Sequence, residues 1–130
     1  MSKKISIAID AMGGDNSPDK TIQGIKIFLD KNRTKNDFII NLFGKEKIIL
    51  DKLKDYKISS DTINVINSET VISDEETPLT AVKSSRGTSM WDCIKHQLDG
   101  KSDISLSAGN TGVLLVISRM ILKMMNEVSK

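Results

Sequence analysis

The 130-residue sequence contains a single cysteine, Cys93, so no internal disulfide can form. No CxxC pair and no Cys/His cluster is present, and His96 is the only histidine. A structural zinc site would need a CxxC pair or a Cys/His cluster, so the sequence offers none. His96 is also not part of a Ser-His-Asp pattern, so no catalytic triad is expected. We therefore expect no metal site and no cofactor, and we interpret Cys93 as a buried, unreactive thiol and His96 as an exposed helix residue.

An excess of charge of one sign is also missing. Nineteen basic and 17 acidic residues leave a formal net charge of +2, and the lysines are dispersed along the chain. A nucleic-acid-binding domain usually concentrates positive charge on one face. The sequence therefore favours a solvated lysine-rich surface and no nucleic-acid partner.

Long hydrophobic runs are absent. The longest apolar tract, residues 113–125, is interrupted by Arg119 and Lys123 and is too short to cross a bilayer. Near the start of the chain, Asp10 ends the apolar run too early for a signal peptide. We therefore expect a cytoplasmic protein.

Aromatic residues make up only 4% of the chain, so Ile, Leu, Val and Met must fill the core of a single domain. Short apolar runs alternate with segments of helical periodicity. The expected strands are residues 5–9, 38–43, 62–66 and 104–107, and the expected helices are residues 18–29, 45–57, 78–82, 88–98 and the tract after Gly112. This alternation predicts an α/β fold with a mainly parallel sheet and right-handed crossovers.

Two glycine-rich segments each follow an expected strand and precede an expected helix. They are Asp10-Ala11-Met12-Gly13-Gly14-Asp15-Asn16 and Ser107-Ala108-Gly109-Asn110-Thr111-Gly112. A helix start offers free backbone N–H groups and the positive end of the helix dipole. Ligands of parallel sheets bind beyond the carboxyl ends of the strands, where both segments lie. The sequence therefore predicts an anionic ligand such as phosphate.

We assign candidate roles to residues in and near these segments. Asp10 and Asn110 are the candidate catalytic residues. The candidate phosphate- or substrate-binding residues are Gly13, Gly14, Asp15, Asn16, Lys83, Arg86, Ser89, Ser107, Gly109, Thr111 and Gly112.

Each of these residues also has a purely structural interpretation. The glycines can serve a plain tight turn, and Asp10 can brace its loop through backbone N–H groups. Asn110 or Thr111 can cap the last helix, and Thr88 or Ser89 can cap the preceding one. Asn16 or Ser17 is the expected N-cap of the first helix. Lys83 and Arg86 can be solvated surface residues.

Residues 5–16 and 77–112 resemble the bacterial phosphate acyltransferase (PlsX) family of phospholipid synthesis. The run Ile7-Ala8-Ile9-Asp10-Ala11-Met12-Gly13-Gly14-Asp15 is similar to the start of that family, and residues 107–112 are similar to its second signature. Between them, Pro78, Ala81-Val82 and Ser89-Met90 keep the family's spacing. The chain departs from the family at Ser85-Arg86-Gly87, where members carry a lysine pair and an aspartate.

The resemblance implies that long-chain acyl–acyl carrier protein and inorganic phosphate react to give acyl phosphate and the free carrier. It also implies a three-layer α/β/α sandwich similar to isopropylmalate dehydrogenases. The implied partners are acyl–acyl carrier protein, phosphate, a second subunit in a homodimer, the inner face of the membrane as a peripheral contact, and a downstream glycerol-3-phosphate acyltransferase.

Family members are more than twice as long as this chain. Residues 1–130 are therefore expected to be the N-terminal part of a single acyltransferase domain whose C-terminal half is absent. The alternatives are a noncatalytic phosphate-binding or dimerisation fragment and a dehydrogenase-like nucleotide-binding domain. The absence of a GxGxxG motif makes the last alternative the weakest. Met120, Met124 and Met125 either fill the core or contact a partner or an acyl chain.

Overall fold

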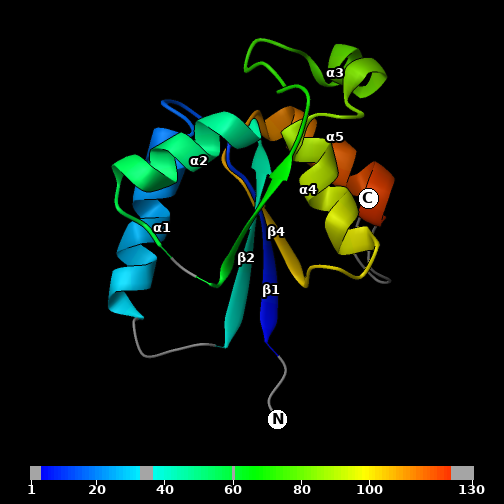
Figure 1. Ribbon diagram of the computed structural model, residues 1–130. Coiled ribbons are helices and arrows are strands. Elements are labelled where there is room, and N and C mark those ends of the chain that lie inside the picture. The colour runs from blue at the N-terminus through cyan, green and yellow to red at the C-terminus, as the bar shows by residue number, and fades with distance from the viewer. Residues whose placement is uncertain (1–3, 33–36, 60, 124–130) are drawn as a thin grey trace.

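The computed structural model describes residues 4–32, 37–59 and 61–123. Within these residues, strands and helices alternate as the sequence predicts (Figure 1). The elements are β1 (Ile5–Asp10), α1 (Asp19–Lys31), β2 (Phe38–Gly44), α2 (Glu46–Asp55), β3 (Ile63–Asn67), α3 (Pro78–Ser84), α4 (Ser89–Leu98), β4 (Ile104–Ser107) and α5 (Thr111–Leu122).

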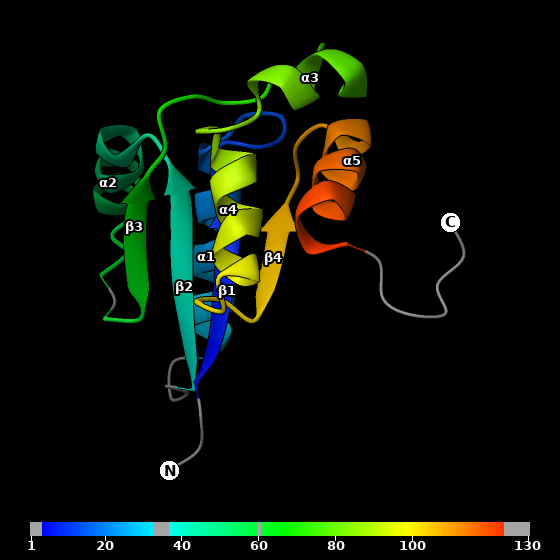
Figure 2. The ribbon, with the colours of Figure 1, turned by 90° about the vertical axis from the view of Figure 1, so that its right-hand side faces the viewer.

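The described strands form one parallel sheet in the order β3-β2-β1-β4. Its central strand β1 pairs on one side with β2 and on the other with β4, so that Ile9 lies between Leu42 and Leu106. Helices α1 and α2 lie on one face of the sheet, and α4 lies on the other with α5 beside it (Figures 1 and 2). The predicted α/β fold with a parallel sheet is therefore confirmed.

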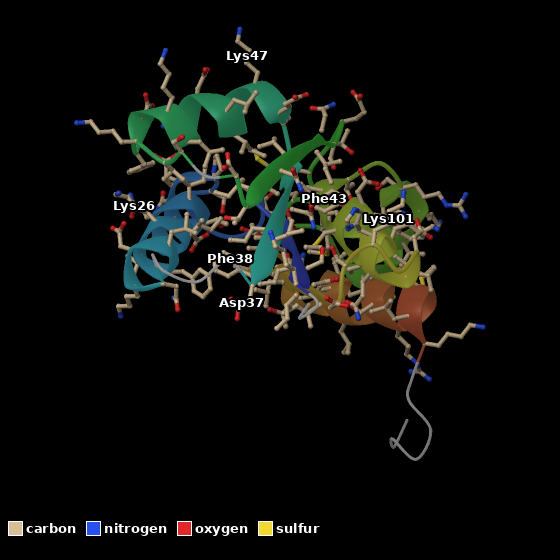
Figure 3. The ribbon with its side chains drawn as sticks, turned by 60° about the horizontal axis from the view of Figure 1, so that its bottom comes forward. Lys26, Asp37, Phe38, Phe43, Lys47 and Lys101 are labelled. Atoms are coloured by element: carbon tan, nitrogen blue, oxygen red, sulfur yellow. The ribbon has the colours of Figure 1, made fainter. Side chains whose placement is uncertain are left out.

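Side chains alternate between the two faces of the sheet because successive residues of a strand point in opposite directions. In β2, Phe38, Ile40 and Leu42 pack with Ile22 and Ile25 of α1. Phe43 instead packs with Ala8 and Cys93 on the α4 side. Figure 3 shows Phe38 beside α1 and Phe43 toward α4. These contacts bury β2 from both sides.

A second apolar cluster joins helices α3, α4 and α5. It contains Met90 and Ile94 of α4, Val113 and Ile117 of α5, and Ala81 of α3. Each of these side chains is at most 1% exposed, and full burial of a large apolar side chain contributes roughly 1.5–3 kcal/mol to folding. The cluster therefore fixes the start of α5 against α4.

Two helix starts differ from the prediction. Pro18 is the N-cap of α1 rather than its first helical residue, and no side chain caps that helix. The Ser17 hydroxyl donates to the carbonyl oxygen of Gly13 instead, and this hydrogen bond links the first glycine-rich segment to the residues just before α1. Helix α5 begins at Thr111, earlier than predicted, because Asn110 caps it and Gly112 lies in its first turn.

No helix among the residues that the structure describes combines the length and the apolar character needed to cross a bilayer.

Candidate functional site

The carboxylate of Asp10 lies at the carboxyl end of β1 and is 3% exposed. Its Oδ1 accepts hydrogen bonds from the Ser89 hydroxyl at 2.6 Å and from the Met12 N–H at 3.1 Å. Its Oδ2 accepts a hydrogen bond from the Ser107 hydroxyl at 2.9 Å. Hydrogen bonds to a charged acceptor are the stronger class, so Asp10 joins its own loop to the starts of α4 and the β4 loop.

The two glycine-rich segments pack directly against each other. The Ser107 oxygen accepts a hydrogen bond from the Gly109 N–H at 3.1 Å. A Cβ added at Gly13 would lie 2.7 Å from Asp10 Oδ2 and 2.8 Å from the Gly109 nitrogen. Residue 13 therefore has no room for a side chain. We refer to residues 10–16 and 107–112 as the paired loops.

Gly14 is required by backbone conformation as well as by space. Its φ is +93°, in the left-handed region that favours glycine, and an added Cβ would lie 2.9 Å from the Ala108 carbonyl oxygen. Asp15 and Asn16 follow it and are exposed. The first of the paired loops thus buries Gly13, half-buries Gly14 and presents the polar side chains of Asp15 and Asn16 to solvent.

Asn110 makes two kinds of structural contact. Its Oδ1 accepts a hydrogen bond from the Val113 N–H at 3.3 Å, which confirms the predicted helix cap. Its Nδ2 donates to the carbonyl oxygen of Glu76 at 2.7 Å, with the carbonyl oxygens of Ser73 and Asp74 at 3.3 Å. The amide therefore anchors the 73–76 segment beside the start of α5, and its catalytic role stays a prediction.

The first turn of α5 lies within the second of the paired loops. Thr111 and Gly112 occupy this turn, where backbone N–H groups have no acceptor within the helix. Thr111 is exposed, whereas Gly112 lies against Pro78, whose Cγ would be 3.2 Å from an added Cβ. The exposed end of the helix dipole thus lies in the second of the paired loops.

The two candidate cations lie on the surface. Lys83 is in the last turn of α3 and is exposed. Arg86 is also exposed, and its guanidinium carbon lies 5.6 Å from the centre of the Trp91 ring. This cation–π contact holds the positive charge near the first turn of α4, the same helix end at which Ser89 contacts Asp10.

Cys93 is fully buried between α4 and the sheet. Burial, with a smaller contribution from the negative charge of Asp10, raises the pKa of the Cys93 thiol to about 12. The thiolate is the reactive form of cysteine, so the predicted buried and unreactive thiol agrees with this environment.

The expectation that His96 is an exposed helix residue is wrong. Its Nδ1 lies 2.6 Å from the Ser102 hydroxyl oxygen, and its ring meets Phe43 edge-on at 5.1 Å. Partial burial is the main cause of a lowered pKa for His96. Met120 on α5 is 50% exposed, whereas Met124 and Met125 lie outside the described residues.

Sequence reasoning also missed a polar network on the α4 face of the sheet. Asn41 of β2 is 5% exposed and donates from Nδ2 to the hydroxyls of Ser6 at 3.0 Å and Ser102 at 3.3 Å. Its Oδ1 accepts from Asn64 Nδ2 at 3.2 Å. The signal for this network was a lone asparagine within the apolar run of β2.

Comparison with known proteins gives consistent matches over almost the whole chain. A family model described as "Fatty acid synthesis protein" matches residues 5–130. A protein of Pelagibacter ubique (strain HTCC1062) named phosphate acyltransferase is 42% identical over 130 residues, which are 100% of this chain and 38% of that protein.

Two further relatives carry the same name. The phosphate acyltransferase of Ehrlichia ruminantium (strain Gardel) is 36% identical over 118 residues, or 91% of this chain and 35% of that protein. That of Streptococcus pyogenes serotype M18 (strain MGAS8232) is 36% identical over 115 residues, or 88% of this chain and 32% of that protein. The chain thus spans about a third of the length of these relatives.

Proposed function

The chain belongs to the fatty acid synthesis protein family, and from this premise we propose that the whole protein is a phosphate acyltransferase in phospholipid synthesis. Its reaction transfers a long acyl chain from acyl carrier protein to inorganic phosphate. The observation that supports this proposal most is the packing of Gly13 against Gly109 around the Asp10 carboxylate, at the edge where β1 and β4 end.

In the proposed reaction, a phosphate oxygen attacks the thioester carbonyl carbon and forms a tetrahedral intermediate. The carbon–sulfur bond then breaks, acyl phosphate forms, and the carrier thiolate takes up a proton. Phosphate is itself the nucleophile, so positioning and electrostatic stabilisation provide the rate enhancement. This chemistry agrees with Cys93, whose raised pKa makes it a poor nucleophile.

Within this proposal, the N–H groups of Thr111 and Gly112 bind the phosphate, and Lys83 and Arg86 add positive charge near it. The paired loops are kept in place by two serines and three glycines, namely Ser89, Ser107, Gly13, Gly14 and Gly109. Asp10 carries negative charge and already accepts three hydrogen bonds, so it acts on the phosphate by positioning the loops. Asn110 acts in the same way, through its helix cap and its contacts with the 73–76 segment.

Ser107→Ala and Ser105→Ala in the whole protein form a matched pair of variants for testing this function. Both serines belong to β4 and point to the same face, but only Ser107 contacts Asp10 and Gly109. Ser105 donates to Gln97 Oε1 at 2.7 Å, away from the paired loops. The assay is phosphate-dependent release of free carrier thiol from acyl–acyl carrier protein.

We expect Ser107→Ala to lower this rate about tenfold or more, because small displacements of positioning groups are costly, and Ser105→Ala to stay near the unmodified rate. Urea unfolding of both variants separates loss of turnover from loss of folding. Equal losses of rate in both variants would remove the assigned role of the paired loops. Absence of turnover by the unmodified whole protein would remove the proposed activity.

The second candidate function is a noncatalytic fragment that binds a phosphate-bearing ligand or a second copy of the chain. The feature that favours it is the exposed apolar surface of β4, where Ile104 is 45% exposed and Leu106 is 53% exposed. A homodimer and peripheral membrane contact belong to the proposal for the whole protein.

A further inference from the structure

An open apolar groove runs along the α1 face of the sheet, away from the α4 side. Its floor is formed by Ile7 and Ile9 of β1 and Leu106 of β4, and its wall by Gly24 and Phe28 of α1. The groove has a volume of about 450 Å³, within the range of small-ligand sites. Leu106 is 53% exposed and Phe28 is 40% exposed, so this apolar surface faces solvent.

The groove is continuous with the paired loops. Asp10, Ser107 and Ala108 line one end of it, and Asp10 is the only charged residue among the described residues that line it. The groove therefore begins at the polar cluster that holds the loops together and continues along β1 between apolar side chains. A thioester of a long acyl chain has the same arrangement, because it has a polar group at one end and a hydrocarbon tail along the rest of its length.

We propose that this groove binds the hydrocarbon tail of the acyl substrate, with the carbonyl end at the paired loops. This inference rests on the proposed function for the chemistry of its ligand. A methylene group is similar in size to a water molecule, which takes about 30 Å³ in the liquid, so the groove holds on the order of fifteen methylenes. That capacity corresponds to a long-chain acyl group.

Gly24 offers a direct way to fill the groove. It lies in the middle of α1 and lines the groove, and a Cβ added there meets no atom within 4 Å. The first atom of a side chain at this position therefore has open space, beside a groove that Gly24 itself lines. The substitution also replaces a residue of low helix propensity, so the variant Gly24→Phe is expected to fold.

The matched control is Lys47→Phe on α2. Lys47 is exposed and its side chain points away from the body of the molecule (Figure 3). The control adds the same aromatic group to a helix surface away from the groove. Any general effect of added hydrophobic surface therefore occurs in both variants.

The experiment measures the dissociation constant of the 130-residue chain for cis-parinaric acid, a fluorescent C18 fatty acid. Hexadecanoic and octanoic acids serve as competitors. We expect Gly24→Phe to weaken probe binding at least tenfold and Lys47→Phe to leave it unchanged. Burial of each methylene is worth roughly a factor of four in affinity, so hexadecanoic acid should displace the probe far better than octanoic acid.

Equal affinities of Gly24→Phe and the unmodified chain would overturn the proposal, as would the absence of chain-length preference. Sedimentation velocity on the same samples tests a second copy as the occupant. A dimer that Gly24→Phe dissociates, with no probe binding by the unmodified chain, would assign the groove to self-association instead. The binding assay contains neither phosphate nor carrier protein, so its failure is distinguishable from failure of the proposed transfer reaction.

Discussion

Replacing Gly13 by alanine tests whether the two glycine-rich segments are held together as the structure has them. The added methyl group would lie 2.7 Å from Asp10 Oδ2, 2.8 Å from the Gly109 nitrogen and 3.0 Å from the Ser107 hydroxyl oxygen. One of these neighbours is backbone and the other two belong to a buried hydrogen-bonded cluster. The loops therefore have to move apart to accommodate it.

The expected cost has two contributions. Overpacking a tight site typically destabilises a protein by about 1–3 kcal/mol. Displacing the Asp10 carboxylate also weakens a hydrogen bond to a charged group, which is worth roughly 1.5–3 kcal/mol. Because both effects arise from the same movement, we expect a loss of about 2–4 kcal/mol in the free energy of unfolding. With a urea slope of roughly 1–3 kcal/mol/M, the midpoint should fall by about 1.5 M.

Two other glycines provide controls for the same chemical change. Gly24→Ala meets no neighbour and lies inside a helix, so it should stabilise the protein by roughly 0.5–1 kcal/mol. Gly100→Ala also meets open space, but its φ of +77° should cost about 1–2 kcal/mol. Urea unfolding followed by circular dichroism measures all three. A Gly13→Ala midpoint equal to or above that of the unmodified chain would refute the reasoning.

The remaining predictions concern two titrating side chains. With its pKa at about 12, native Cys93 should react with a disulfide reagent at pH 8 roughly a thousandfold more slowly than the same thiol in urea; similar rates would contradict its burial. Burial lowers the pKa of folded His96 below its usual 6.5, so the unfolded chain binds the proton more readily and the folded chain loses stability as the pH falls through 6.5. The free energy of unfolding, measured in urea, should therefore fall less between pH 7 and pH 5.5 in His96→Asn than in the unmodified chain. Equal decreases in both proteins would disprove this contribution of His96.

Local patterns in the sequence predicted the elements well because short-range physics determines them. Each expected strand has a counterpart within a residue or two, and Asn110 caps α5 as one of its interpretations required. The predicted start of α1 was wrong because the Ser17 hydroxyl donates a hydrogen bond to the Gly13 carbonyl oxygen. A capping rule does not describe such a contact within a loop. Boundaries depend on such individual hydrogen bonds, whereas element types depend on periodicity.

The contacts of the site were harder to predict than its location. Strand ends in a parallel sheet share an edge, which is why Asp10 and Ser107 could be placed near each other from the sequence. The hydrogen bond from Ser89 spans 79 residues and depends on how α4 packs on the sheet. The environment of His96 likewise depends on Phe43, a residue of a distant strand. No local pattern carries information of this kind.

The central position of β1 has a consequence for synthesis on the ribosome. β1 leaves the ribosome before the other described strands and can pair with β2 once residues 38–43 have followed, but its other side pairs with β4, whose Ile104 lies opposite Ile7. At about 5–20 residues per second, the 97 residues that separate Asp10 from Ser107 take roughly 5–20 s to make. Throughout that interval, one edge of the strand that becomes the middle of the sheet is open to pairing with other chains.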